Sequence, residues 1–333
     1  MIIEGKQYDD NRQKLSDVLP IASPYVVEIF PWDVCNFKCF YCVQSQGAVD
    51  RTRLALDSFR KIIDDLAGLG HYKQIYLCGS GEPLLHPDIV KMVSYVSNAK
   101  IADSVDIVSN GSLLNKELSD SLLDAGLDRL RISLQGITDE DYQKSCGVKL
   151  SVDSLIENIR YFRRRRDQGH YPCKVQIKIM EEMIRGREAL FYERFTDTAD
   201  DIRLEHLSPY NALENENLDD YQSSKYGMDL GRMEICPMAF YRMHIKANGD
   251  VFPCCTSTYY DDCLGNAIDD DIRTIWHGEK HKKLLLQLLK KEKVTDIRHC
   301  NGCHDFKYLS TPADCLDNHI DKLIEKYEQL SMR

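Results

Sequence analysis

The sequence predicts an α/β protein with a cysteine-rich region towards its C-terminal end. Three observations support this prediction. Short segments rich in β-branched and aromatic residues alternate with amphipathic segments as far as about residue 210. A tight group of three cysteines directly follows the first of these segments, and the alternation stops where a second group of cysteines begins. Strands that alternate with helices pair in parallel through right-handed crossovers, so the first part should form a parallel sheet.

Six strands are expected in the first part. They are residues 25–30, 74–78, 105–108, 130–134, 174–180 and 202–207. Between them, apolar residues recur with the period of a helix, as they do after the N-cap candidate Ser151. That helix ends with four consecutive arginines, residues 163–166. We interpret them as a solvated, cationic helix end that complements the helix dipole, rather than as a phosphate site.

Composition excludes some classes of partner. The chain has 333 residues and a formal net charge of −10, and its lysines and arginines are scattered, which argues against nucleic acid as the main partner. There is no apolar run after a basic start and no stretch long enough to span a membrane, so we expect a cytoplasmic protein without a membrane partner. Thirteen cysteines in a cytoplasmic chain indicate metal ligation more than disulfides.

Cys35, Cys39 and Cys42 are spaced to bind one metal centre. Thiolates are soft ligands that select zinc, copper(I) or iron–sulfur clusters. A structural zinc or an ordinary cubane needs a fourth ligand nearby, and residues 43–53 contain neither cysteine nor histidine. Three ligands therefore suggest an iron–sulfur cluster with one open iron. The alternatives are a truncated zinc site or three buried free cysteines.

This Cys-x3-Cys-x2-Cys pattern, with Tyr41 before the third cysteine, resembles the signature of radical S-adenosylmethionine (SAM) enzymes. The resemblance implies that the open iron of a [4Fe–4S] cluster binds the amino and carboxylate groups of SAM. The reduced cluster then cleaves SAM to methionine and a 5′-deoxyadenosyl radical. The resemblance also implies a partial (β/α)6 barrel for residues 25–210, whereas the periodicity shows only α/β alternation. In such folds the active site lies at the C-terminal ends of the strands.

The segment after the second expected strand resembles the family's Gly-Gly-Glu-Pro motif. It reads Gly79, Ser80, Gly81, Glu82 and Pro83, with serine in place of the first glycine of the pair. The resemblance implies that residues 80–83 bind the methionine part of SAM. Glu82 would accept a charge-assisted hydrogen bond from the SAM amino group. The alternative is a Gly/Pro turn with an exposed glutamate.

Polar residues also follow the third and fourth expected strands. By resemblance, Ser133 is the candidate contact to the SAM ribose, and Asn110 and Gln135 are expected to line the SAM or substrate pocket. Tyr41 is expected near the adenine, through its backbone or its ring. The alternative is that Asn110 and Gln135, each followed by glycine, simply form tight turns.

The second cysteine group follows a polar segment, residues 211–232, which we interpret as a linker. Residues 241–245 and 251–252 should form a β-hairpin around Asn248-Gly249, which brings Cys236 near Cys254. Cys300 and Cys303 provide a second close pair. Four thiolates from two pairs would make a closed tetrahedral site.

This arrangement resembles the "twitch" region, a shortened SPASM domain with one auxiliary [4Fe–4S] cluster. After Cys303 the next cysteine is Cys315, so the further cysteines of the full SPASM pattern are missing. The layout is similar to that of the radical SAM dehydrogenase of butirosin biosynthesis. Cys255 and Cys315 are reserve ligands, and a four-cysteine zinc ribbon is the alternative. The expected organisation is a lead-in (1–24), the partial barrel (25–210), the linker (211–232), a small α+β twitch/SPASM-like domain (233–315) and a C-terminal helix (316–333).

The function implied by the resemblance is hydrogen abstraction from an unactivated C–H bond. An auxiliary cluster that accepts an electron would make the reaction an oxidation; a thiol that returns a hydrogen atom, from Cys255 or Cys263, would make it an epimerisation. We expect a sugar, an aminocyclitol or a nucleotide-linked sugar as substrate, because one auxiliary cluster is expected and no additional N-terminal domain for leader recognition is expected. The alternatives are a maturase of ribosomally made peptides and a non-catalytic zinc protein. The enzyme would need flavodoxin or ferredoxin as its reductant.

Overall fold

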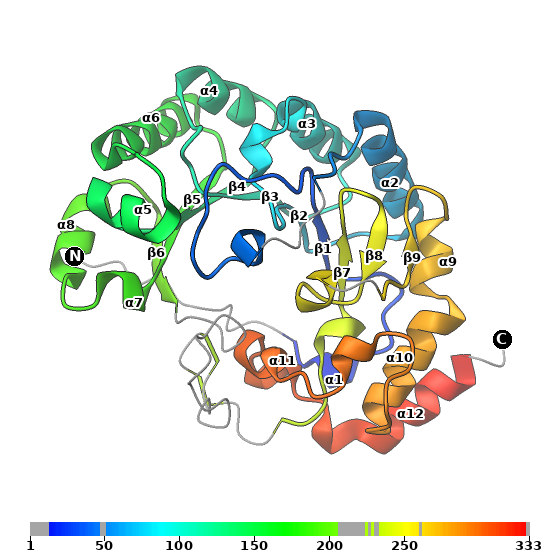
Figure 1. The fold of residues 1–333 in the computed structure, drawn as a ribbon. Coiled ribbons are helices and arrows are strands. Elements are labelled where there is room, and N and C mark those ends of the chain that lie inside the picture. Colours follow the sequence, from blue (N-terminus) through cyan, green and yellow to red (C-terminus); the bar gives the residue numbers. More distant parts are fainter. Residues whose placement is uncertain are drawn as a thin grey trace.

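The computed structural model describes residues 13–46, 51–205, 224–225, 228–229, 233–259 and 262–330. Its strands form one open nine-stranded sheet in the order β6-β5-β4-β3-β2-β1-β7-β8-β9 (Figure 1). The strands of the first part are β1 (Val26–Ile29), β2 (Gln74–Leu77), β3 (Val105–Ser109), β4 (Arg129–Leu134), β5 (Lys174–Met180) and β6 (Asp201–Glu205). They pair in parallel in chain order, as predicted. The last two residues of the expected sixth strand, 206–207, lie outside the described residues.

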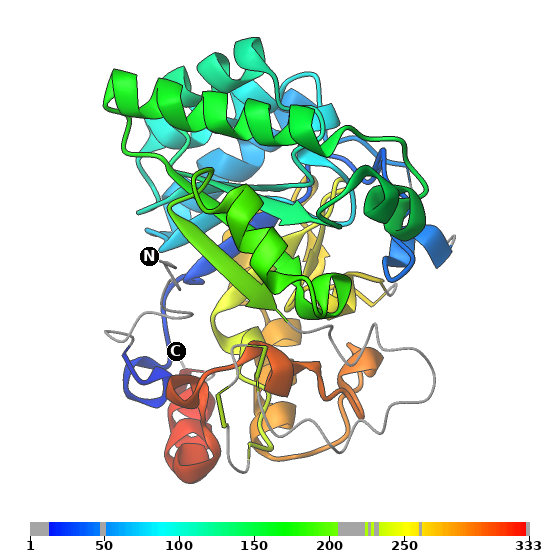
Figure 2. The same ribbon diagram turned by 90° about the vertical axis from the view of Figure 1, so that its left-hand side faces the viewer.

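Helices cover the outer face of this sheet (Figure 1). The helices of the first part are α2 (Leu56–Leu69), α3 (Ile89–Ala99), α4 (Lys116–Asp124), α5 (Asp139–Cys146), α6 (Val152–Gly169), α7 (Glu181–Ile184) and α8 (Glu188–Phe195), of which α5 lies at the carboxyl ends of the strands (Figure 2). Their apolar faces are buried; α2, for example, buries Phe59, Ile62, Ile63 and Leu66. Helix α5 was not predicted, although Thr138 and Asp141 form a capping box at its start.

The inner face of the sheet is polar. Along β4, Leu130, Ile132 and Leu134 are buried, and the intervening residues project to the opposite face because successive side chains in a strand alternate. Those intervening residues are Arg129, Arg131 and Ser133. The same face carries Glu28 on β1, whose register partners are Tyr76 and His244. The concave side of the partial barrel therefore presents charged and hydrogen-bonding groups.

The C-terminal part continues the same sheet. The predicted hairpin is present as β7 (Arg242–Ile245) and β8 (Asp250–Phe252), with Gly249 at a φ of 92° in the turn. Strand β9 (Gly265–Asn266) pairs with β8. Strand β7 pairs in parallel with β1, which was not predicted. The remaining helices are α1 (Leu15–Val18), α9 (Ile272–Trp276), α10 (Glu279–Leu289), α11 (Asp305–Leu309) and α12 (Ile320–Gln329).

Figure 2 shows how the C-terminal helices sit relative to the sheet. The orange and red helices lie below the layers of blue and green strands and helices. Most of the predicted linker, 211–232, is outside the described residues, so the domain boundaries remain a prediction. No helix in the part of the chain that the structure describes is long and apolar enough to cross a membrane.

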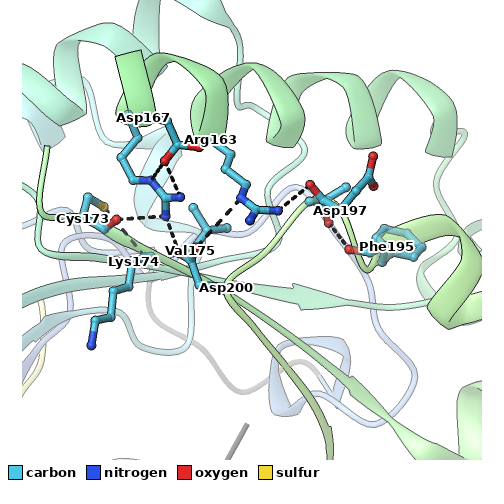
Figure 3. Close-up of polar contacts among 10 residues, drawn as sticks. Arg163, Asp167, Cys173, Lys174, Val175, Phe195, Asp197 and Asp200 are labelled. Atoms are coloured by element: carbon cyan, nitrogen blue, oxygen red, sulfur yellow. Dashed lines mark hydrogen bonds and ion pairs between the residues drawn. The ribbon is translucent and has the colours of Figure 1, made fainter. Parts of the chain in front are cut away.

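Only Arg164 of the four arginines near the end of α6 is exposed, so our interpretation of a solvated helix end is wrong for Arg166 and incomplete for Arg163 (Figure 3). Arg166 is buried and forms ion pairs with Asp167 and Asp200. Its Nη1 also donates to the backbone carbonyl of Cys173 at 3.2 Å. Arg163 Nη1 donates to the carbonyl of Asp197 at 2.7 Å. These side chains connect the end of α6 to the start of β5 and to the loop before β6.

We expect Arg166→Ala to destabilise the protein by about 1.5–3 kcal/mol, because the Cys173 carbonyl and the part-exposed carboxylate of Asp200 both lose a buried, charged donor. Asp200 would lose this partner while still accepting from the backbone N–H of Val175. Urea unfolding of the Arg164→Ala variant is the matched control, because Arg164 is an exposed neighbour on the same helix. We expect less than about 0.5 kcal/mol for the control. Equal losses in the two variants would contradict the buried ion-pair role of Arg166.

Candidate functional site

The three cysteines of the first group lie on one loop, which we call the triad loop (residues 35–42). It follows β1 and is held by backbone hydrogen bonds to the end of α5. Lys38 N donates to the Cys146 carbonyl and Phe40 N donates to the Ser145 carbonyl, both at 3.0 Å. Within the loop, Cys42 N donates to the Cys39 carbonyl at 3.0 Å. The loop therefore has a fixed shape at the C-terminal end of the sheet, where the active site was expected.

The three thiols are electrostatic neighbours. Burial, followed by the charges of Glu82 and Cys42, raises the pKa of Cys35 to about 11. The contact with Cys146, burial, and then the charges of Cys42 and Cys35 raise the pKa of Cys39 far above its ordinary value. All thirteen cysteines, which lie within the described residues, are free thiols. Partly buried thiols that would repel one another as thiolates suit a cationic centre with soft ligands, so the donor set fits an iron–sulfur cluster.

Glu82 is buried, which contradicts the alternative of a turn with an exposed glutamate. Its Oε1 accepts from Ser109 Oγ at 2.6 Å and from Leu84 N at 3.0 Å, and its Oε2 accepts from Asn110 N at 2.8 Å. Burial raises the pKa of Glu82, and these three hydrogen bonds oppose that shift. Glu82 thus connects the loops after β2 and β3. A carboxylate has about four acceptor positions, so one remains at Oε2.

Position 81 must be a glycine, because the backbone just before the triad loop leaves no room for a side chain there. A Cβ on Gly81 would lie 1.9 Å from the carbonyl oxygen of Trp32 and 2.7 Å from that of Val34. The next residue, Glu82, donates its N–H to the Val34 carbonyl at 2.9 Å. Ser80, the departure from the family motif, donates its hydroxyl to Asp33 Oδ1 at 2.9 Å. The loop after β2 therefore packs directly on the segment that leads into the triad. Pro83 begins the 3₁₀ turn Pro83–Leu85.

Two of the other predicted SAM residues, Asn110 and Gln135, contact the triad loop, and a third, Tyr41, belongs to it. Asn110 Nδ2 donates to Asn36 Oδ1 at 2.9 Å and lies 3.9 Å from Cys35 Sγ. The hydroxyl of Tyr41 donates to Gln135 Oε1. Gln135 Nε2 donates to the backbone carbonyl of Ser133 at 3.3 Å, and Ser133 lies on the inner face of β4. The sequence-predicted residues are thus gathered at the carboxyl ends of β1 to β4.

The second cysteine group also comes together. Burial raises the pKa of Cys236 well above its ordinary value, and the charges of Cys254, Cys300 and Cys303 add to this shift. Burial, followed by the charge of Asp305, raises the pKa of Cys303 to about 11. The hairpin brings Cys236 to Cys254, and the 3₁₀ turn Arg298–Cys300 presents the second pair. Four partly buried thiols form the donor set that a tetrathiolate cluster requires.

Sequence reasoning missed two further donors beside this group. His299, Cys303 and Asp305 offer ligand atoms that all lie within 4.8 Å of one another. His299 directly precedes Cys300, and Asp305 follows Cys303 by two residues. This closeness in sequence to predicted ligands could have identified them. Burial raises the pKa of Asp305. Mixed nitrogen, sulfur and oxygen donors suit zinc more than an iron–sulfur cluster, so metal analysis must include zinc.

The spare cysteines have different surroundings. Burial, followed by the charges of Cys254 and Glu28, raises the pKa of Cys255 to about 12, so this thiol lies within electrostatic range of the Glu28 carboxylate. Burial and then Asp250 raise the pKa of Cys263, whose carbonyl accepts from Lys280. Cys315 Sγ lies 3.6 Å from Asp317 Oδ2. Of the two candidate hydrogen donors, Cys255 is the one that lies beside the inner face of the sheet.

A buried polar group on the inner face lies next to Cys255, and sequence reasoning missed it. Glu28 Oε1 is 3.1 Å from Arg242 Nη1, Glu28 Oε2 is 3.2 Å from His244 Nδ1, and Cys78 Sγ donates to Glu28 Oε2 at 3.5 Å. Burial alone would raise the pKa of Glu28, but His244 and Arg242 outweigh it and lower the pKa to about 2. His244 is fully buried, and its Nε2 has no hydrogen-bond partner among the described residues.

Two family models match the chain. Residues 29–180 match the Radical SAM superfamily, and residues 236–304 match the SPASM iron–sulfur cluster-binding domain. The first match contains the triad loop and the loops after β2, β3 and β4. The second contains Cys236, Cys254, Cys300 and Cys303. The matches imply SAM and a [4Fe–4S] cluster for the first domain and further iron–sulfur binding for the second.

Curated relatives share the first part of the chain. The dTDP-4-amino-4,6-dideoxy-D-glucose ammonia-lyase of Streptomyces venezuelae is 29% identical over 155 residues, which are 46% of this chain and 32% of that protein. The GTP 3′,8-cyclase of Chlorobaculum tepidum is 36% identical over 209 residues, which are 63% of this chain and 59% of that protein. The chain thus spans between about a third and three fifths of the length of these relatives.

Solved structures share the fold over most of the chain. BtrN in complex with AdoMet and 2-DOIA aligns with a TM-score of 0.55 at 17% identity and covers 84% of this chain and 92% of its own. Streptococcus suis SuiB bound to the precursor peptide SuiA aligns with a TM-score of 0.61 at 19% identity and covers 80% of this chain and 67% of its own. The family matches and the open mixed sheet agree with the predicted architecture. The chain therefore belongs to the radical SAM superfamily and carries a C-terminal SPASM-type iron–sulfur cluster-binding domain.

Proposed function

We propose that this radical SAM enzyme abstracts a hydrogen atom from a C–H bond of a carbohydrate-like small molecule. The observation that supports this substrate class best is the polar inner face, where Glu28, Arg242 and His244 form a buried charged group. Hydroxyl-rich molecules are recognised by such groups, because buried polar atoms need hydrogen-bond partners. The similarity to enzymes named for a nucleotide-linked amino sugar and for GTP supports a sugar or nucleotide-linked sugar.

In this proposal the two cysteine groups hold different cofactors. Cys35, Cys39 and Cys42 ligate the cluster that binds SAM, and the auxiliary [4Fe–4S] cluster has the ligands Cys236, Cys254, Cys300 and Cys303. When bound, the first cluster and SAM supply the 5′-deoxyadenosyl radical, and flavodoxin or ferredoxin supplies the electron. Glu82, through the free position at Oε2, accepts from the SAM amino group, and Asn110 and Gln135 hold the loops around it.

Oxidation of a secondary alcohol is the favoured outcome. It removes one hydrogen atom, one proton and one electron from the substrate. In this proposal His244 takes the proton, because Glu28 Oε2 lies 3.2 Å from its Nδ1 and would orient the ring as a base. The hydrogen atom goes to the 5′-deoxyadenosyl radical and the electron to an iron–sulfur acceptor.

Epimerisation is the second candidate, because the Cys255 thiol lies beside Glu28 on the inner face. A thiol can return a hydrogen atom from the opposite side of a carbon radical, and its hydrogen exchanges with solvent. A peptide substrate is the further alternative. A zinc protein without catalysis would contain zinc and no sulfide.

The experiment uses anaerobically reconstituted enzyme with dithionite and SAM. UDP-glucose, dTDP-glucose, free aminocyclitols and short synthetic peptides are offered in heavy water, and 5′-deoxyadenosine and product mass are measured. We expect a sugar or cyclitol to stimulate SAM cleavage and to give a product that has lost two hydrogens. One solvent deuterium at an inverted carbon, lost in Cys255→Ala, would replace oxidation by epimerisation. Stimulation by peptides alone would overturn the substrate class.

Glu82→Ala should weaken SAM binding by about 1.5–3 kcal/mol, because a hydrogen bond to a charged ammonium is lost. Ser109→Ala is the matched control. It removes one of the three bonds that hold Glu82 but leaves Oε2 in place. SAM affinity measured by equilibrium dialysis should fall in Glu82→Ala and change little in Ser109→Ala. If both variants lose affinity equally, Glu82 acts only by holding the two loops together.

A further inference from the structure

Cys146 contacts the triad loop although it belongs to neither cysteine group. It is the last residue of α5 and is fully buried. Its Sγ lies 3.6 Å from the Sγ of Cys39, within the range of a sulfur hydrogen bond. The Oγ of the preceding residue, Ser145, lies 3.2 Å from Cys146 Sγ and donates to the Gln135 carbonyl at 2.8 Å. The Cys146 thiol is therefore held in place on the side of Cys39.

The backbone around this contact fixes both partners. The carbonyls of Cys146 and Ser145 accept from Lys38 and Phe40, the residues on either side of Cys39. Gly147 ends α5 in a left-handed conformation with a φ of 67°, so the helix stops directly after the contact. Two backbone bonds thus bracket Cys39 against the end of α5. Only the short side chains of Cys39 and Cys146, each with one rotatable bond, then set the distance between the two sulfur atoms.

The direction of the hydrogen bond follows from cluster ligation. Thiolates, not thiols, ligate iron–sulfur clusters, so ligated Cys39 has no proton to donate. The hydrogen in the contact must then come from Cys146, whose single S–H is shared between Cys39 Sγ and Ser145 Oγ, because the Ser145 hydroxyl already donates to the Gln135 carbonyl. We propose that Cys146 is a positioning residue whose S–H donates a hydrogen bond to the Cys39 thiolate and raises the reduction potential of the SAM-binding cluster. This inference rests on the proposed role of Cys39 as a ligand.

The expected effect has a clear sign. Reduction makes the cluster more negative, and a donor at a ligand sulfur stabilises the more negative state. Hydrogen bonds to the cluster sulfurs are among the factors that set iron–sulfur potentials. A cluster that must be reduced before SAM cleavage would therefore be easier for a flavodoxin or ferredoxin to reduce. Loss of the Cys146 thiol should make reduction harder without removal of a ligand.

The test compares Cys146→Ala, Cys146→Ser and Cys173→Ala in reconstituted holoenzyme without substrate. Cys173 is a buried, lone cysteine of the same domain and serves as the matched control. Iron and sulfide are counted, and the EPR signal that changes on addition of SAM is titrated against potential. In Cys146→Ala we expect unchanged iron and a three- to tenfold lower ratio of reduced to oxidised cluster at a fixed potential, roughly the worth of one hydrogen bond. Tenfold corresponds to about 59 mV for a one-electron couple.

The variants Cys146→Ser and Cys173→Ala test whether the change in potential comes from the lost donor rather than from the loss of a buried side chain. Serine keeps a donor, so Cys146→Ser should recover at least part of the potential, and Cys173→Ala should match the wild type. A potential in Cys146→Ala equal to that of the wild type would overturn the proposal and leave Cys146 with packing alone. Loss of about four iron atoms in Cys146→Ala would also overturn it, because Cys146 would then be needed to hold the cluster. Absence of any SAM-responsive signal in the wild type would instead contradict the proposed function.

Discussion

SAM cleavage should be lost completely when Cys35, Cys39 and Cys42 are replaced together by alanine. Without the three thiolates, no cluster can bind SAM and deliver the electron that cleaves it. The second cysteine group is untouched, so the variant should retain one cubane, or about four iron atoms. The measurements are 5′-deoxyadenosine formed with dithionite under anaerobic conditions and the iron and sulfide content after reconstitution.

The control for this variant replaces three cysteines that belong to neither group, Cys173, Cys263 and Cys315. It should keep about two cubanes and wild-type SAM cleavage, although the loss of buried Cys173 can lower its stability. If the triad variant still forms 5′-deoxyadenosine at the wild-type rate, the assignment of the triad is wrong. If the control loses a whole cubane, one of its cysteines is a ligand that we have not assigned.

Replacement of Cys300 and Cys303 by alanine should separate SAM cleavage from substrate oxidation. These residues provide half of the four-thiol group, and two thiolates cannot retain a cubane, so about four iron atoms should be lost. The triad remains, so SAM binding and slow, uncoupled 5′-deoxyadenosine formation should persist. The rate at which the oxidised product forms should fall at least about a hundredfold. Without the auxiliary cluster the substrate radical has no electron acceptor, which raises the activation free energy of oxidation by several kcal/mol.

Cys173→Ala is the matched control, because Cys173 is buried in the first domain and is a candidate ligand in neither group. It should keep both clusters and full product formation. The result is read from iron content, 5′-deoxyadenosine and product together. An unchanged yield of oxidised product in the variant without Cys300 and Cys303 would show that these residues have no part in the oxidation. Loss of zinc instead of iron would favour the zinc alternative, for which His299 and Asp305 are further donors.

The local sequence pattern was sufficient to predict the six strands of the partial barrel. The six parallel strands follow from alternation of short apolar segments with helices, and each expected segment has its strand within a few residues. The turn at Asn248-Gly249 predicted the hairpin, because glycine tolerates the positive φ that such turns need. The approach of Cys236 to Cys254 then followed from the hairpin geometry. These features depend on interactions between residues that are close in sequence.

Features that depend on distant contacts were missed or misread. The sequence pattern predicted a solvated Arg166 side chain, but in the fold it pairs with Asp200 and donates to the Cys173 carbonyl. The pairing of β7 with β1 has no local signal. Neither has the approach of Cys146 to Cys39, which are 107 residues apart in the chain. The group formed by Glu28 and His244 was invisible for the same reason, since its members come from different strands of the sheet.

The structure also gives different reasons for residues that the motif had singled out. Gly81 was expected to bring the backbone close to SAM, yet the carbonyl oxygens of Trp32 and Val34 already leave no room for a Cβ. Glu82 was expected to serve SAM, yet three donors of the protein already occupy its oxygens. A motif residue can therefore serve loop packing as well as cofactor contact, and the Ser109→Ala control distinguishes the two roles for Glu82.

The parallel pairing of β1 with β7 also affects the order in which the chain can fold during synthesis. Glu28 and Arg242 are ion-paired neighbours on these strands and are 214 residues apart. Until β7 has left the ribosome, one edge of β1 has unpaired N–H and C=O groups, which are a template for aggregation. Long-range strand pairing is slow because loop-closure entropy precedes the contacts that reward it. The nascent barrel should therefore depend on chaperones until the hairpin arrives, and a fragment that stops before residue 233 should aggregate when expressed alone.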